Sequence, residues 1–177
     1  MSDNLTKIKN EYIKCKKSKS LALNTISVGK ISDYEWIASF IGPKKTGYKG
    51  GLFKLIIKIP ENYPESRPEI RFKYPVFHPN VQCYNDETIN PEGYHICCSY
   101  INNWSSDRSI EGALNAIYNL MIIPTPEHGY GNDAKKLLDS LKGDCYHEDY
   151  KKKCNEWVRK YATINNNWTY YLTFLNR

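Results

Sequence analysis

Five prolines lie within 20 residues near the middle of the chain and divide it into two halves of different character: Pro60, Pro64, Pro68, Pro75 and Pro79. Proline fixes φ and lacks the amide hydrogen that a helix or a central strand needs, so this density excludes long regular structure there. The stretch is predicted to be an ordered, proline-braced crossing. Extended patterns precede this crossing, and helical patterns follow it.

The first half begins with a helical pattern and continues with extended segments. Leu5, Ile8, Tyr12 and Cys15 share one face of a predicted helix over residues 3–17. Four strands are then expected, over residues 24–28, 34–41, 51–59 and 69–73. The third alternates apolar residues with lysines, as a half-buried antiparallel strand does. Because short turns separate these strands, an antiparallel meander is favoured over a parallel sheet.

The second half carries three helical patterns. The most apolar stripe in the chain consists of Ile110, Ala113, Leu114, Ile117, Leu120 and Met121, which predicts a core helix. Asn132 or Asp133 is positioned to cap a second helix that Gly143 ends, and residues 150–161 predict a third. The expected fold class is therefore α/β (α+β), with an N-terminal helix, a four-stranded antiparallel sheet and helices after it.

Length and composition limit the class of protein. A chain of 177 residues with 41% hydrophobic residues supports one buried core, and no apolar run is long enough for a membrane span. Six scattered cysteines do not resemble a small disulfide scaffold, and no signal peptide is evident, so a cytoplasmic or nuclear location with free thiols is expected.

A net charge of +6 raises nucleic acid as a rival partner. The basic residues are spread along the chain, and the densest cluster, Lys14 to Lys19, falls at the end of the first predicted helix, where cations suit the helix dipole. An acidic protein surface is therefore the favoured partner, and nucleic acid is not.

Candidate reactive groups gather between Tyr74 and His128. Cys97 supplies a thiol nucleophile, Asn80 an amide that can donate to an oxyanion, and His128 an imidazole that can act as a base. No phosphate cradle, dinucleotide fingerprint or spaced metal quartet is present, so no cofactor or metal is expected. These residue types together propose acyl transfer through a cysteine.

The order of several motifs resembles the ubiquitin-conjugating enzymes. The motifs are Trp36, Gly42-Pro43, Tyr48-x-Gly50-Gly51, Phe53-Lys54-Leu55, Tyr63-Pro64-x-x-x-Pro68, Phe77-His78-Pro79-Asn80-Val81, Ile96-Cys97, Trp104 with Ile110, Pro124-x-Pro126, Glu156-Trp157 and Lys160-Tyr161-Ala162. The resemblance predicts a catalytic core over residues 1–162. Residues 163–177 form an aromatic extension that is expected to pack on the core or on a partner.

The resemblance implies a mechanism. Cys97 accepts ubiquitin or a ubiquitin-like modifier from an activating enzyme as a thioester, and passes it to a lysine of a protein substrate or to a ubiquitin ligase. Asn80 donates to the oxyanion or braces the loop that surrounds it, and His78 belongs to the same site as the member that hydrogen-bonds to backbone. His128 stands where Asp or Ser is common and a subset has His, so its role stays open between activating a lysine and transfer to a ligase cysteine.

The resemblance also implies surfaces for partners. Lys7 and Lys14 on the first helix are expected to dock the activating enzyme, although a solvated basic face is the alternative. Two loops correspond to ligase-binding loops, the first carrying Tyr63 and Glu65 and the second Ser105 and Ser106. Glu65 replaces a usual apolar anchor, and the second loop lacks the usual Ser-Pro-Ala, so the ligase stays undefined.

Sixteen residues separate Asn80 from Cys97, more than the family usually has. Their acidic residues, Pro91 and Gly93 favour a surface loop over added strands. This insertion, residues 81–95, is expected to protrude beside Cys97 and to gate the site.

Four alternatives remain. The first concerns the modifier. Similarity to the SUMO branch lies in Gly50 to Leu55 and in Val76 to Val81. Similarity to the ubiquitin branch lies in Arg71-Phe72 and Glu156-Trp157, and ubiquitin is favoured. An inactive binding module with the same fold is the second alternative.

The other two alternatives concern the reactive cysteine. Cys98 is the rival nucleophile, but neighbours in an extended stretch point to opposite faces. A thiol protease would need a paired base, which His95 does not supply.

Overall fold

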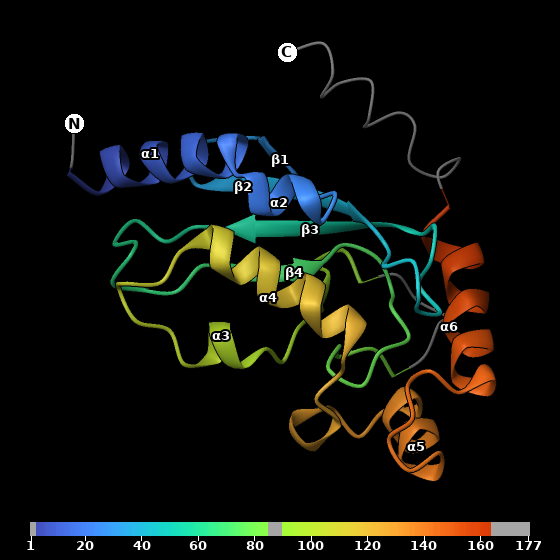
Figure 1. Cartoon of the computed structure of the whole chain (residues 1–177). Helices are drawn as coiled ribbons and strands as arrows, with labels where there is room; N and C mark the ends of the chain where they lie inside the picture. Colours follow the sequence, from blue (N-terminus) through green and yellow to red (C-terminus); the bar gives the residue numbers. More distant parts are fainter. Residues whose placement is uncertain (1–2, 85–89, 164–177) are drawn as a thin grey trace.

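The computed structural model describes residues 3–84 and 90–163 (Figure 1). Its elements are α1 (Asp3–Lys17), α2 (Lys19–Leu23), β1 (Ser27–Lys30), β2 (Glu35–Ile41), β3 (Leu52–Lys58), β4 (Glu69–Phe72), β5 (Tyr94–His95), α3 (Ser99–Asn102), α4 (Ile110–Ile122), the 3-10 helix η1 (Pro126–His128), α5 (Asp133–Ser140) and α6 (Glu148–Tyr161). The expected α/β class, with an N-terminal helix before the sheet and helices after it, is confirmed.

The strands form one antiparallel sheet in the order β1-β2-β3-β4-β5. The four expected strands are present, although β1 begins at Ser27 and not at Asn24. The short helix α2 ends at Leu23, and the Ser18 side chain caps its N-terminus by accepting a hydrogen bond from the Leu21 N–H at 3.0 Å. Asn24 is its C-cap and Thr25 has a φ of 55°, so these two residues form a turn before the strand. Sequence reasoning missed both α2 and the fifth strand.

The core lies between the sheet and α4, which crosses one face of the sheet in Figure 1. The α4 side chains Ile110, Leu114 and Ile117 are fully buried, as the apolar stripe predicted. Phe40 of β2 packs edge-on against Tyr118 of α4, with ring centroids 5.5 Å apart. Helix α4 is therefore packed firmly on the sheet.

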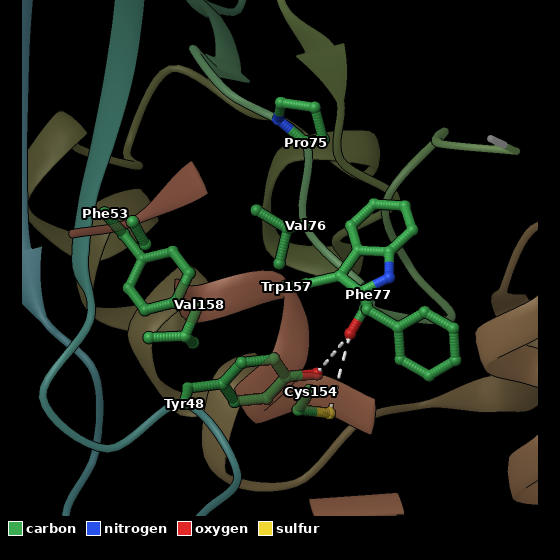
Figure 2. A pocket seen from close by; sticks show the side chains of 9 residues that line it. Tyr48, Phe53, Pro75, Val76, Phe77, Cys154, Trp157 and Val158 are labelled. Carbon is green, nitrogen blue, oxygen red and sulfur yellow. Dashed lines mark hydrogen bonds between the residues drawn. The ribbon is translucent and has the colours of Figure 1, made fainter. Parts of the chain in front are cut away.

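Helix α6 holds the end of the proline-rich crossing in place. Figure 2 shows Tyr48 and Cys154 both directed at the carbonyl of Phe77: the Tyr48 hydroxyl donates at 2.8 Å, and the Cys154 thiol lies 3.8 Å away. The Trp157 ring packs on the Phe77 ring at 5.6 Å. Burial raises the pKa of the Cys154 thiol to about 12, so this cysteine is a packing residue. These contacts position the turn that begins at His78.

The insertion differs from its prediction at its C-terminal end. Tyr94 and His95 pair with Phe72 and Arg71 to form β5, so the expectation of a loop without added strands is wrong there. The free edge of β4 carries unpaired backbone groups that this short strand satisfies. The backbone of Gly93 lies close to β4 and has a φ of +80°, and a Cβ atom at this position would lie 2.6 Å from the Phe72 carbonyl oxygen. Residues 85–89 lie outside the described residues.

Side-chain contacts fasten the same segment to the sheet. Lys58 forms an ion pair with Glu92 at 3.2 Å, and the Arg71 guanidinium donates to the Glu92 carbonyl at 3.3 Å. Residues 90–95 therefore belong to the folded domain and do not simply protrude from it.

Other expectations fall partly outside the described residues. The predicted aromatic extension covers residues 163–177, of which 164–177 lie outside the described residues, so its packing stays a prediction.

All six cysteines are free thiols. Within the described residues, none of the helices combines the length and the apolar character that crossing a membrane requires.

Candidate active site

Cys97 lies between the edge strand β5 and the short helix α3. Its N–H donates to the Asn80 carbonyl at 2.8 Å, and the bridge between Val81 and Ile96 aligns the two segments. The Cys97 side chain is partly exposed. The two ends of the insertion therefore lie side by side, so Asn80 and Cys97 are adjacent despite their separation in sequence.

The neighbouring Cys98 faces the interior. It is 4% exposed and occupies the extended residue before α3, at φ −130° and ψ 120°. Burial raises the pKa of its thiol. Because a buried thiol ionises less readily, Cys97 is the better nucleophile of the two.

The side chain of Asn80 is completely buried, and its hydrogen bonds go to Thr125. Its Nδ2 donates to the Thr125 carbonyl at 2.8 Å and approaches Thr125 Oγ1 at 3.1 Å, while its Oδ1 accepts from the Thr125 N–H at 3.0 Å. Of the two roles predicted for this amide, these contacts match the bracing of the loop. The amide reaches the segment that carries His128.

His78 has both ring nitrogens occupied by backbone. Nδ1 accepts from the Asn80 N–H at 3.0 Å, which places the ring proton on Nε2, 3.0 Å from the Leu120 carbonyl that accepts it. Burial lowers the pKa of this imidazole to about 4. His78 was predicted as a member of the site that bonds to backbone, and the structure leaves it no nitrogen for proton transfer.

Asn132 is a second buried amide at the site, and sequence reasoning identified it only as a possible helix cap. Its Oδ1 caps α5 by accepting from the Lys135 N–H at 3.0 Å. Its Nδ2 donates to the His78 carbonyl at 3.0 Å and to the Val81 carbonyl at 2.8 Å. One side chain therefore ties the first turn of α5 to the turn that presents Asn80.

One further side chain contacts the Cys97 sulfur, and no sequence motif signalled it. The Asn102 Nδ2, at the end of α3, lies 3.4 Å from Cys97 Sγ. The pKa of the Tyr130 hydroxyl is raised by burial and then by the nearby Cys97 and Tyr84 groups. Helix α3 was not predicted, so the alignment of Asn102 with Cys97 was not visible in the sequence.

His128 ends η1 and is exposed to solvent. Its imidazole forms no hydrogen bond or ion pair within residues 3–84 and 90–163. Its backbone N–H donates to the Thr125 carbonyl at 3.1 Å, the same carbonyl that the Asn80 amide binds. The role predicted for His128 stays a prediction, and Asn80 controls the position of its loop.

The residues expected at partner surfaces divide into two groups. Lys7 and Lys14 are exposed on α1, with Lys7 in an ion pair with Asp3 at 3.0 Å. Glu65, Ser105 and Ser106 are exposed as well. All five are accessible to a partner.

Tyr63 is the exception, because it is only 2% exposed and packs on Trp104 with ring centroids 5.9 Å apart. Its prediction as a partner contact is therefore wrong. The Trp104 indole N–H donates to the Pro64 carbonyl at 2.8 Å, so this aromatic pair joins the two loops to each other. The two loops that flank the site are therefore tied to each other.

The arrangement is suited to acyl transfer. It offers an accessible thiol, a backbone fixed by the hydrogen bond from the Cys97 N–H to the Asn80 carbonyl, and the Asn102 amide in contact with the sulfur. No cluster of three His, Cys, Asp or Glu side chains suitable for a metal occurs within the described parts of the chain.

Comparisons with known proteins agree with this geometry. A family profile described as "Ubiquitin-conjugating enzyme" matches residues 7–158. The chain is similar to "Protein PEROXIN-4" of Arabidopsis thaliana, 35% identical over 60% of this chain and 64% of that protein. It is also similar to "Ubiquitin-conjugating enzyme E2 7" of Arabidopsis thaliana, 30% identical over 72% of this chain and 76% of that protein.

Among solved structures, a putative ubiquitin conjugating enzyme from Plasmodium yoelii superposes with a TM-score of 0.73. The two are 26% identical, and the match covers 92% of this chain and 97% of the other. A Toxoplasma gondii ubiquitin conjugating enzyme shares the fold with a TM-score of 0.70 at 22% identity, over 89% of this chain and 98% of that one.

Proposed function

The chain belongs to the ubiquitin-conjugating enzyme family, and on that premise we propose that it carries ubiquitin as a thioester on Cys97. The ubiquitin arrives from an activating enzyme and leaves to a substrate lysine or to a ligase. The observation that carries the proposal is the contrast between adjacent thiols, Cys97 accessible and Cys98 buried, beside the turn held by Asn80.

The charging step is a thiol exchange. The Cys97 thiolate attacks the carbonyl carbon of the modifier's thioester on the activating enzyme, a new S–C bond forms, and the activating enzyme's thiolate leaves. The accessible sulfur and the fixed backbone of Cys97, whose N–H is bound to Asn80, favour this attack. The exposed lysines of α1 support docking of the activating enzyme.

The discharge step joins the modifier to an amine. The amine nitrogen bonds to the thioester carbon, the C–S bond breaks with the electron pair returning to Cys97, and the amine loses a proton. His128 is an exposed imidazole on the braced loop and is proposed as the base that accepts this proton. The loop's position depends on the paired hydrogen bonds between Asn80 and Thr125.

The test is a charging assay. The protein is incubated with activating enzyme, ATP and either ubiquitin or SUMO, and the products are separated on non-reducing and reducing gels. The expected result is an adduct with ubiquitin that disappears under reduction and is absent from the Cys97→Ala variant. An adduct with SUMO alone would reassign the modifier, and no adduct with either would favour a binding module with this fold.

A further inference from the structure

The amide of Asn102 is a side-chain hydrogen-bond donor in contact with the reactive sulfur. Its Nδ2 lies 3.4 Å from Cys97 Sγ, whereas the Asn80 amide is turned away to Thr125. We propose that Asn102 is a catalytic residue that donates to the Cys97 thiolate and to the oxyanion of the thioester, oriented for this by Arg67.

The orientation of the Asn102 amide follows from its second partner. Arg67 Nη1 approaches Asn102 Oδ1 at 3.5 Å. A guanidinium only donates hydrogen bonds, so the amide oxygen faces Arg67 and the NH₂ group must face the sulfur. Arg67 is thus a positioning residue, and Asn102 is the group that touches the reacting atom.

Both residues are presented by anchored segments. On the side of α3, Ile101 is buried and the Tyr100 hydroxyl accepts from the Ser109 N–H at 3.2 Å, which fixes the helix against the start of α4. On the side of the proline-rich loop, the Trp104 indole binds the Pro64 carbonyl at 2.8 Å. A donor held by rigid surroundings loses little freedom when charge develops beside it.

The reaction places charge where this donor lies. When an amine attacks the thioester, the C–N bond forms and the carbonyl π electrons move to oxygen. That oxygen belongs to the carbon bonded to Sγ, so the oxyanion forms two bonds away from the atom that the Asn102 amide contacts. The oxyanion then re-forms the carbonyl, the C–S bond breaks, and the amide donates to the departing thiolate.

The contact itself can be tested without any modifier. Alkylation of Cys97 by iodoacetamide at pH 7, followed by mass spectrometry of the Cys97 peptide, reports the availability of its thiolate. Loss of one donor in Asn102→Ala is expected to slow this reaction by about fivefold. Asn102→Asp, which replaces the donor with a carboxylate, is expected to slow it further. Asn103→Ala is the matched control, because its side chain is exposed and makes no hydrogen bond among the described residues.

The catalytic consequence rests on the proposed function and is measured separately. Single-turnover discharge of the charged enzyme to free lysine is expected to slow by about tenfold in Asn102→Ala, less than the loss of a buried oxyanion donor because Asn102 is exposed. Asn103→Ala should discharge at the wild-type rate. If the wild-type protein is never charged, the proposed function fails, and the alkylation rates still decide whether Asn102 acts on Cys97.

The role of Arg67 is tested by a double-mutant cycle. Arg67→Ala alone is expected to slow alkylation by about twofold, and to have no further effect in the Asn102→Ala background, since it acts through Asn102. Melting temperatures of all variants are compared to detect a loss of folding. Wild-type alkylation and discharge rates in Asn102→Ala would overturn the proposal, and additive effects of the two substitutions would overturn the positioning role of Arg67.

Discussion

Asn80 and Thr125 are joined by hydrogen bonds that run in both directions, Nδ2 to the Thr125 carbonyl at 2.8 Å and the Thr125 N–H to Oδ1 at 3.0 Å. This two-way pairing resembles the hydrogen bonding between the backbone groups of neighbouring strands in a sheet. It connects the turn before the insertion to the loop after α4. Asn80 therefore holds two segments. Its side chain fixes the loop after α4, and its carbonyl accepts a hydrogen bond from the Cys97 N–H.

Asn80→Ala is expected to lower the free energy of unfolding by about 1–3 kcal/mol, because it removes the acceptor of the Thr125 N–H and one of the two donors to the Thr125 carbonyl. Urea denaturation measures this change. Thr125→Val is the control, since it removes only the weaker contact at Oγ1 and should cost less than about 1 kcal/mol. Wild-type stability of Asn80→Ala, with discharge alone impaired, would instead point to a direct oxyanion contact.

The two adjacent cysteines should behave differently on charging. Cys97→Ser is expected to form an ester with the modifier that resists reduction, and Cys98→Ser a thioester that reduction cleaves, because only the Cys97 side chain is accessible. Gels run with and without reductant measure both. Charging of Cys97→Ser through a reducible bond would show that Cys98 is the nucleophile.

His78 should make the fold sensitive to acid. Its pKa falls from the ordinary 6.5 to about 4 on burial, so between these values the unfolded chain binds a proton that the folded protein does not. Stability contributed by His78 is complete above pH 6.5, falls as the pH drops, and is lost by about pH 4. The loss amounts to about 3 kcal/mol at 1.36 kcal/mol per pKa unit.

The experiment compares urea unfolding between pH 7 and pH 4 for the wild type and His78→Gln. The variant is expected to be less stable at pH 7 but to lose less stability on acidification. His95→Gln is the control, since it replaces an exposed imidazole with the same side chain. Equal slopes for wild type and His78→Gln would refute the assignment.

Gly93→Ala tests how the insertion joins the sheet. Both the positive φ and the Phe72 carbonyl, 2.6 Å from the new Cβ, oppose an alanine, so a loss of about 2–4 kcal/mol is expected. Gly50→Ala has a similar φ of +78° but open space around it, and should cost only about 1–2 kcal/mol. Thermal unfolding measures both. Equal losses would mean that β5 is not tightly packed against β4.

The sequence by itself determined the features that depend on local order. The apolar stripe of α4 reports one buried face, because a helix repeats its side chains at a fixed period. The half-buried alternation predicted for β3 is wrong, since Leu52 to Leu55 are all buried and Lys54 is only 6% exposed. The choice of Cys97 over Cys98 came from motif order and the alternation of an extended chain. The structure places the second thiol in the interior, as that alternation expects.

Only the tertiary structure decided which groups the site residues contact. Asn80 and Thr125 are 45 residues apart, and Tyr63 is buried by Trp104 from another loop, so neither environment is written in a local pattern. The edge strand β5 exists because β4 offers unpaired backbone groups, and its own two residues carry too weak a signal. The contact of Asn102 with Cys97 depends on a four-residue helix that no periodicity reveals, since its position is set by packing against α4.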